Sequence, residues 1–552
     1  MTNYQFTGGT ICAPATIPGT GAISIIRVSG KESLAIADKV IDTKGVPIAE
    51  TEGYRLRYGT VFEADGSVLD NVIVSVFRAP HSYTGEDSVE VSCHASRFIV
   101  NKILELLVNA GARIAAPGEF TRRAFVNGKM DLAQAEAVAD VIASQSAASH
   151  RVAMNQLKGG FSSELKKLRE KLLTMTSLLE LELDFSEEDV EFASRKELGQ
   201  LVDDSLTHIR RLTASFSRGN AIKNGVPVAI VGATNTGKST LLNALLGEER
   251  AIVSDIAGTT RDTIEETLNI DGILFRFIDT AGIRETDETI EKIGIDRTFK
   301  KLGEAAVVLG MTDLSRGEAA VLEDADFILS KVNEMGGVKN VAAENDGAET
   351  GWASTAETGG ASPAEMGGAP LAETGGASQH GHGDGQERKV VILVNKCDVA
   401  GDFYRDDNGT GYCSGNELGK NMAKIGDNKN VNQDNNIVSL IENKYDNCKV
   451  IPISAKTGKG LSTLTKTLGE IGSEITGSTD ETLVTNVRHY EALVRAASAL
   501  ERVRAGLHIA TLPPDLIAQD LREALYHLGE IVGEISTDET LGNIFRNFCI
   551  GK

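Results

Sequence analysis

The sequence predicts a multidomain α/β chain in which a domain of alternating strands and helices is inserted into a helical domain, behind an α+β amino-terminal domain. Three observations support this. A buried strand, a glycine loop and an amphipathic helix follow one another in VPVAIVGATNTGKSTLLNALLG, residues 226–247. Apolar residues recur every three or four positions from Asp131 to Phe185 and again from about Glu481 to Phe548. Short apolar strands precede all of these segments.

The amino-terminal strands are AISIIRVSG at 22–30 and LDNVIVSVF at 69–77. The segment DSVEVSCHA follows them, and a helix is expected from about Ser96 to Ala110. We predict four segments with these bounds: an amino-terminal domain at 1–130, the first part of a helical domain at 131–224, the inserted P-loop domain at 225–476, and the second part of the helical domain at 477–552.

Two low-complexity inserts are expected within the P-loop domain, at about 332–388 and 401–447. An eight-residue repeat of AETG and AETGG type, between 344 and 378, is too small and polar to bury a core, so it predicts disorder. The second insert is rich in Asn, Asp and Gly and predicts a loop.

Composition excludes several classes of protein. The formal charge of −22 argues against the uniformly basic surface of a general nucleic-acid binder. The six cysteines are scattered without a C-x-x-C pair, so neither a zinc site nor a disulfide framework is indicated. No apolar run is long enough to span a bilayer and the first residues lack a signal peptide, so no membrane association and a cytoplasmic location are expected.

The segment 226–247 matches the phosphate-binding motif G-x-x-x-x-G-K-[ST] with its strand and helix in place. Gly232 and Gly237 let backbone N–H groups close around phosphates. Lys238 is expected to reach the outer phosphates, and Ser239 to supply an oxygen for Mg²⁺. A nucleoside triphosphate is therefore the predicted ligand.

Three further motifs follow in order. In DIAGTTRD, Thr259 and Thr260 are candidates for the second Mg²⁺ ligand, and FRFIDTAG ends a strand at Asp279, with Gly282 near the γ-phosphate. VVILVNKCD ends another strand at Asn395 and Asp398, and VIPISAK supplies Ser454, Ala455 and Lys456. A carboxylate at 398 accepts hydrogen bonds from both guanine N1–H and the exocyclic amine, a pair of donors that adenine lacks. The four motifs together predict a guanine-nucleotide domain, which resembles the translation-factor-like P-loop GTPases.

Two catalytic groups of Ras-type enzymes are missing. Ile283 follows DTAG where a water-orienting glutamine would stand, and Glu285, Glu288 and Glu291 are alternatives that spacing does not separate. No arginine finger is evident. The amide oxygen of Asn235 either holds a monovalent cation against the phosphates or makes a plain loop-stabilising hydrogen bond.

Further blocks identify a family. APGEFTRRAFVNGKMDLAQAEAVADVI (116–142), SYTGEDSVEVSCH (82–94) and the terminal FCIGK join GATNTGKSTLLN and DTAGIRETDETIEKIGIDR. Together they closely resemble the MnmE (TrmE) family, GTPases of tRNA wobble-uridine modification. The resemblance covers the whole chain except the two inserts.

The resemblance implies a folate-binding and dimerisation domain at the amino terminus, followed by a helical domain that carries a potassium-dependent G domain. It also implies a water-orienting role for Glu291 and a candidate chemical role for Cys549, for which a buried structural thiol is the alternative. The implied folate contacts are Arg27, Glu90, Lys129 and Lys552, for 5-formyl- or methylene-tetrahydrofolate. The implied metal ligands are Ser239 and Thr260 for Mg²⁺, and Asn235, Ser254, Ile256 and Thr259 for K⁺. The implied GTP contacts are Asn235, Thr236, Gly237, Lys238, Ser239, Thr240, Ser254, Asp255, Ile256, Ala257, Gly258, Thr259, Thr260, Asp279, Thr280, Ala281, Gly282, Asn395, Lys396, Asp398, Ser454, Ala455 and Lys456.

As partners, the resemblance implies a second copy of the chain, the FAD-dependent protein MnmG (GidA) in a heterotetramer, and a tRNA substrate. The product would carry a 5-(carboxymethyl)aminomethyl-type group on uridine. The inserts depart from the family pattern and put dimerisation of the G domains in question. The alternative reading is a nucleotide-gated ribosome or RNA assembly switch, which would not need Arg27, Glu90, Lys129 or the cysteine tail.

Overall fold

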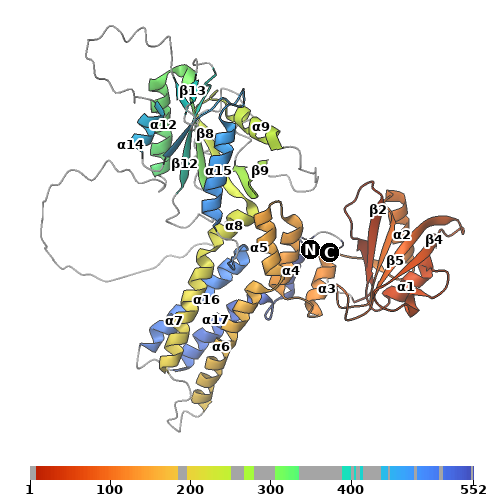
Figure 1. The fold of residues 1–552 in the computed structure, drawn as a ribbon. Helices are drawn as coiled ribbons and strands as arrows, with labels where there is room; N and C mark the ends of the chain where they lie inside the picture. Colours follow the sequence, from red (N-terminus) through yellow and green to blue (C-terminus); the bar gives the residue numbers. More distant parts are fainter. Residues whose placement is uncertain are drawn as a thin grey trace, which may run out of the picture. The chain divides into compact units, whose positions relative to one another are not determined.

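The computed structural model describes residues 8–184, 195–249, 266–278, 305–334, 388–398, 403–405, 411–413, 437–445, 448–477, 481–508, 514–546, 548 and 551. The chain forms two compact units, shown as a ribbon in Figure 1. The first unit combines Met1–Lys223 with Ser478–Lys552, and the second is Asn224–Gly477, which interrupts the first along the chain.

A seven-stranded sheet begins the first unit. Its strands are β1 (Ile11–Pro14), β2 (Ile23–Ser29), β3 (Ile41–Asp42), β4 (Arg55–Phe62), β5 (Val68–Phe77), β6 (Ser88–His94) and β7 (Arg113–Ile114). They lie in the order β3-β4-β5-β6-β2-β1-β7, antiparallel except for the parallel pair of β1 and β7. In β5 the buried Val72, Val74 and Val76 alternate with outward-facing residues, the pattern of a sheet with one face on a core. This confirms the strands expected at 22–30 and 69–77.

Two helices cover the buried face of this sheet. They are α1 (Ser33–Val40) and α2 (Arg97–Asn109), and a 3-10 turn, η1 (Ile48–Glu50), packs against α1. Leu34 and Ile36 of α1, together with Ile103 and Leu107 of α2, belong to the core that the strands line. The helix expected from about Ser96 to Ala110 is confirmed as α2.

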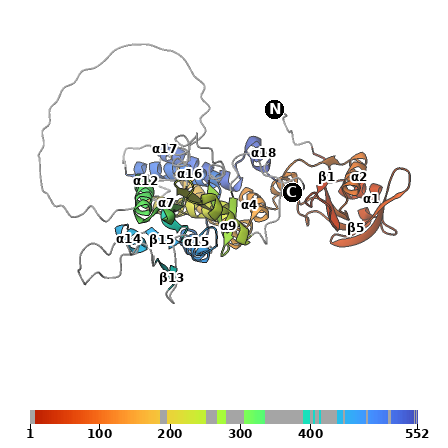
Figure 2. The same cartoon turned by 90° about the horizontal axis from the view of Figure 1, so that it is seen from above.

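The rest of the first unit is helical. Its helices are α3 (Glu119–Val126), α4 (Leu132–Ala143), α5 (Ala147–Leu157), α6 (Gly160–Asp184), α7 (Arg195–Ala214), α8 (Phe216–Asn224), α16 (Val487–Leu507), α17 (Pro514–Val532) and α18 (Asp538–Arg546). Capping boxes at Asp131 and Ser146 start α4 and α5. Helices α6, α7, α16 and α17 pack around one apolar core and lie side by side in Figure 1, and Figure 2 shows α16 and α17 together from above. None of the described helices is both long and apolar enough to cross a membrane.

The second unit is built on a six-stranded sheet. Its strands are β8 (Val226–Gly232), β9 (Glu266–Ile270), β10 (Ile273–Ile278), β11 (Val307–Asp313), β12 (Lys389–Asn395) and β15 (Cys448–Pro452), in the order β15-β12-β11-β8-β10-β9. All neighbours are parallel except β9 with β10. Its helices are α9 (Lys238–Glu249), α12 (Glu318–Glu334), α14 (Ile437–Lys444) and α15 (Leu461–Thr476), and η3 (Leu314–Arg316) is a 3-10 turn. The nearly continuous burial of β8, β11 and β12 is that of parallel strands covered on both faces.

The interpretation of 401–447 as a loop was wrong in part. The segment contains β13 (Phe403–Arg405) paired with β14 (Gly411–Cys413), and the helix α14. Ile441 of α14 is buried in the core of the second unit, with Val438 and Tyr445 packed beside it. The insert predicted from 332 also starts too early, because α12 continues to Glu334 and buries Val332. Packing against the sheet stabilises these short helical pieces, which their composition does not reveal.

Candidate functional site

The phosphate-binding loop of the motif lies between β8 and α9. Gly232 has a φ of 155°, and a side chain there would collide with the carbonyl oxygen of Met311. Gly237, at a φ of 97°, leaves no room for a Cβ beside the Asn395 amide nitrogen, 2.5 Å away. Both glycines are therefore required by close packing, Gly232 against a backbone carbonyl and Gly237 against a side-chain amide, as well as by the turn.

Lys238 is held inside this loop. Its ammonium donates hydrogen bonds to the carbonyl oxygens of Gly232 and Ala233, both at 2.8 Å. Burial lowers the pKa of Lys238, because a charged ammonium is less well solvated there. The lysine side chain thus folds back over the start of the phosphate loop, and the loop ends at the N-terminus of α9, where helix N–H groups favour an anion.

Asn235 occupies the outer bend of the loop. It adopts a left-handed backbone conformation, with a φ of 61°, and its side chain is exposed. The next residue, Thr236, is buried and donates from Oγ1 to the carbonyl oxygen of Ala233 at 2.9 Å. Within the described part of the chain, Asn235 makes no side-chain hydrogen bond, so Thr236 rather than Asn235 ties this loop together.

The two segments expected to recognise the base meet the phosphate loop through Asn395. This residue is buried at the end of β12; its amide nitrogen donates to Thr236 O at 2.7 Å, and its amide oxygen accepts from Ala455 N at 3.0 Å. Asp398 is exposed, and its Oδ1 accepts a hydrogen bond from Ser454 Oγ at 2.7 Å. That hydrogen bond lowers the pKa of Asp398, so the carboxylate stays ionised at neutral pH.

The sheet explains why motifs far apart in sequence converge. Gly232, Asn395 and Ser454 stand at or just beyond the carboxyl ends of β8, β12 and β15, which belong to one parallel array. In such sheets ligands bind at this edge. The predicted contacts Asn235, Thr236, Gly237, Lys238, Ser239, Thr240, Asn395, Lys396, Asp398, Ser454, Ala455 and Lys456 all lie in this described region.

Several predicted site residues lie outside the described residues. They are Ser254, Asp255, Ile256, Ala257, Gly258, Thr259, Thr260, Asp279, Thr280, Ala281, Gly282, Glu291, Cys549 and Lys552.

A second candidate site lies on the seven-stranded sheet. Arg27 of β2 stands directly opposite Glu90 of β6 in the strand register, and its Nε and second guanidinium nitrogen reach Glu90 Oε1 at 2.9 and 2.8 Å. The guanidinium also lies 5.0 Å from the centre of the Tyr83 ring and 5.6 Å from that of Phe120. The structure therefore brings together two of the residues expected to bind folate and fixes the arginine between two aromatic rings.

The carboxyl-terminal tail returns to this arginine. The remaining guanidinium nitrogen of Arg27 lies 3.5 Å from the carbonyl oxygen of Gly551. Gly551, at a φ of 101°, packs so closely on Pro14 O that a Cβ would collide with it. Earlier in the tail, Phe545 and Phe548 pack beside Gly118 at the start of α3. The last predicted contact of the set, Lys129, is exposed and donates to Pro80 O at 3.0 Å.

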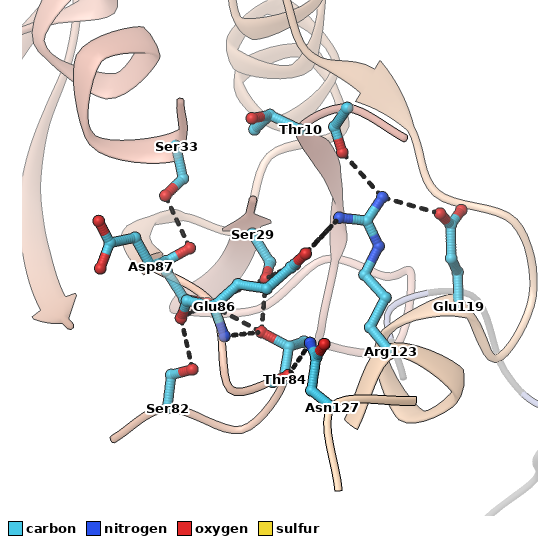
Figure 3. Close-up of polar contacts among 12 residues, drawn as sticks. Thr10, Ser29, Ser33, Ser82, Thr84, Glu86, Asp87, Glu119, Arg123 and Asn127 are labelled. Atoms are coloured by element: carbon cyan, nitrogen blue, oxygen red, sulfur yellow. Dashed lines mark hydrogen bonds and ion pairs between the residues drawn. The ribbon is translucent and has the colours of Figure 1, made fainter. Parts of the chain in front are cut away.

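A buried polar network, drawn in Figure 3, holds the loop that carries Tyr83. Arg123 of α3 is almost fully buried and bonds both Glu86, at 3.0 Å, and Glu119, at 3.1 Å. Glu86 Oε2 in turn accepts from Ser29 Oγ at 3.0 Å, and Asn127 of the next turn donates to Thr84 O at 2.7 Å. These contacts connect the end of β2, the 82–88 loop and α3 into one framework.

Sequence reasoning missed Tyr83, Phe120, Glu86 and Arg123 as parts of the second site. The blocks SYTGEDS and PGEFTRRAF contain them, but a charged residue in a sequence is more often solvated than buried. The signal that could have identified them is that both blocks combine charged and aromatic residues. Because buried charges need partners, two such blocks are candidates for pairing with each other.

Comparison with known proteins identifies both parts of the chain. Residues 10–129 match the family model for the GTP-binding protein TrmE N-terminus, and residues 132–549 match that for the MnmE helical domain. The "tRNA modification GTPase MnmE" of Parabacteroides distasonis is 44% identical over 98% of this chain and 100% of its own length. The protein of the same name from Bacteroides thetaiotaomicron is 44% identical over 98% of this chain and 99% of its own.

Among solved structures, that of a GTP-binding protein from Sulfolobus solfataricus in complex with GDP is similar to part of this chain. It is 16% identical and covers 56% of this chain and 67% of its own, with a TM-score of 0.24, too low to support an inference. The family models and the full-length relatives suffice: the chain belongs to the MnmE family of tRNA modification GTPases.

Proposed function

We propose that this chain is a potassium-dependent GTP hydrolase that, with the FAD-dependent partner MnmG (GidA), forms a 5-(carboxymethyl)aminomethyl-type group on wobble uridine in certain tRNAs. The observation that carries the nucleotide part is the position of Asn395. One amide joins the phosphate loop at Thr236 to the base-recognition loop at Ala455. A ligand that carries both phosphates and a guanine base would contact both of these loops at once.

Guanine selectivity would come from Asp398. Its carboxylate accepts the N1–H and exocyclic amine donors of guanine, and Ser454 fixes its orientation through the 2.7 Å hydrogen bond. At the other end, Lys238 would exchange the carbonyl oxygens of Gly232 and Ala233 for the outer phosphates. This exchange costs little, because one set of ammonium hydrogen bonds replaces another and a stronger charge pairing is gained.

Two described residues, Ser239 and Asn235, offer oxygen atoms suited to the two expected cations. Ser239 is exposed in the first turn of α9 and would hold Mg²⁺ together with Thr260. Asn235 is exposed at the bend of the loop, with an amide oxygen that could hold K⁺ together with Ser254, Ile256 and Thr259. Bound cations neutralise negative charge that develops on the phosphates. In this proposal Glu291 orients the attacking water.

The folate part of the proposal rests on the charged set around Arg27. Both contacts of Arg27 with Glu90 use Oε1, so within the described part of the chain Oε2 is left to accept from a pterin amino group. Lys129, exposed and cationic, suits the carboxylates of a folate glutamate tail. The contact of Gly551 with Arg27 supports the proposed contribution of Lys552 to folate binding and of Cys549 to the chemistry.

The assembly expected for this function is a homodimer that joins MnmG in a heterotetramer and acts on tRNA. Both sites are proposed to serve one reaction: the folate supplies the one-carbon unit, and GTP hydrolysis controls the conformation in which it is transferred.

Two assays on the purified full-length chain test this proposal. GTP hydrolysis should fall sharply when Na⁺ replaces K⁺, and equal rates in both salts would contradict the potassium role of Asn235. Arg27→Ala should abolish binding of 5-formyltetrahydrofolate yet leave GTP hydrolysis intact, since the two residue sets lie in different units. The control is Arg55→Ala, which removes an exposed arginine of β4. Unchanged folate binding by Arg27→Ala would refute the folate site.

A further inference from the structure

Asp313 lies at the guanine-binding edge although no sequence motif points to it. It is the last residue of β11, directly beside Asn395 in the parallel pairing of β11 with β12. Only 5% of its surface is exposed. A buried aspartate at this position needs partners for both carboxylate oxygens.

The two oxygens of Asp313 have separate partners. Oδ1 accepts from the backbone nitrogen of Ser315 at 3.0 Å and from its hydroxyl at 2.6 Å, which starts the 3-10 turn η3. Oδ2 accepts from the Lys396 ammonium at 2.6 Å. Burial alone would raise the pKa of Asp313, but the hydrogen bonds from Lys396 and Ser315 outweigh it and lower the pKa, so the carboxylate is ionised.

Lys396 is held in a conformation that lysine disfavours. Its φ is 63°, in the left-handed region, and such residues persist only where their surroundings determine them. This turn leads directly to Asp398: Cys397 N bonds Ile453 O at 3.2 Å, and Asp398 then meets Ser454. The lysine side chain is 35% exposed although its ammonium is bound to Asp313, which leaves its alkyl stem available as an apolar surface.

We propose that Asp313 is a positioning residue for guanine recognition. It holds the Lys396 ammonium, and thereby fixes both the lysine stem that would lie against the base and the left-handed turn that orients Asp398. The assignment rests on the proposed role of Lys396 and Asp398 in GTP binding. It adds a residue from a different strand, 83 positions away, to the specificity determinants of that site.

The test is GDP affinity of the full-length chain, measured with a fluorescent GDP analogue. Asp313→Asn keeps an oxygen for Ser315 but loses the charge that holds Lys396. We expect the Kd for GDP to rise about tenfold, the scale of one lost charge-assisted hydrogen bond. The kcat at saturating GTP should change little, because Asp313 touches neither the phosphates nor the attacking water. A purely structural role would instead reduce kcat and thermal stability together.

A double-mutant cycle shows whether Asp313 acts through Lys396. In a Lys396→Met background, Asp313→Asn should alter the Kd by less than about twofold. Lys396→Arg, which keeps a cation for Asp313, should bind GDP more tightly than Lys396→Met does. An equal effect of Asp313→Asn on the Kd in the unmodified chain and in Lys396→Met would overturn the inference. Unchanged GDP affinity of Lys396→Met itself would also overturn it, and this measurement does not require Asp313→Asn to fold.

Ser315→Ala is the matched control, because it removes a partner of the other carboxylate oxygen. It should leave GDP affinity unchanged, and a loss as large as that of Asp313→Asn would assign the effect to the turn η3 and refute the role of Lys396. Absence of GDP binding by the unmodified chain would refute the proposed function itself. Unmodified binding combined with an unaffected Asp313→Asn would refute only this inference.

Discussion

Asp398→Asn is expected to change the base preference of the nucleotide site from guanine to xanthine. The substitution is nearly isosteric, and the asparagine Oδ1 can still accept the hydrogen bond that Ser454 now donates at 2.7 Å. The carboxylate accepts both donors of guanine, whereas the amide accepts only one and opposes the other with its own N–H. Xanthine carries a carbonyl in place of the exocyclic amine, so it complements the amide.

The magnitude follows from the hydrogen bonds involved. One charge-assisted hydrogen bond is lost and one donor of guanine is left unpaired, which together cost about 3 kcal/mol. The Kd for GDP should therefore rise roughly a hundredfold or more. Calorimetric titration of GDP and xanthosine diphosphate into the full-length chain measures both affinities. The control is Asp324→Asn on α12, whose carboxylate pairs with Arg316 and is not among the expected base contacts.

Binding of GDP within about twofold of the unmodified chain would refute the reasoning, because it would mean that Asp398 does not contact the base. Loss of both nucleotides would also contradict it, since the base contacts alone should change.

Two further substitutions test the first unit. Gly118→Ala places a Cβ 2.7 Å from Phe545 O at a φ of 66°, so it should release the tail and weaken folate binding. The control is Gly128→Ala, which imposes the same backbone strain at a φ of 68° but has open space around it. It should leave the tail docked, and hydrogen exchange of the tail measures this difference. Burial raises the pKa of Glu136, but the contacts with His489 and Arg488 outweigh it and lower that pKa to about 2. Glu136 therefore stabilises the helices above the ordinary carboxyl pKa, and this contribution disappears as pH falls toward 2. Glu136→Gln should therefore lower the Tm measured by calorimetry at pH 7 and make the Tm less dependent on pH in acid. The control Glu491→Gln, which changes an exposed ion pair, should do neither. An equal acid dependence of Tm in Glu136→Gln and the unmodified chain would contradict this prediction.

The phosphate loop could be predicted from the sequence because its information is local. Glycines, Lys238 and the following helix occur within one short segment, and the backbone geometry at Gly232 and Gly237 explains the motif directly. The positions of the residues expected to recognise the base were also predictable, because each follows a strongly apolar strand. Parallel strands then bring these ends to one edge without further information.

The remaining contacts depend on pairs that sequence order does not connect. Lys396 and Asp313 are 83 residues apart, and Arg27 and Gly551 are 524 residues apart. Helix α14 was missed for a different reason: the segment 401–447 as a whole is rich in Asn and Asp, which obscures the short apolar helix at its end, and burial of Ile441 stabilises that helix.

The most direct test of the central claim is nucleoside mass spectrometry of bulk tRNA from a strain that lacks this protein. The account predicts loss of aminomethyl-type wobble uridines, restored by the intact gene but not by Glu291→Ala or Arg27→Ala versions that accumulate to the same level. An unchanged nucleoside profile in a strain without a redundant copy would contradict it, and would favour an assembly switch that binds GTP without base chemistry.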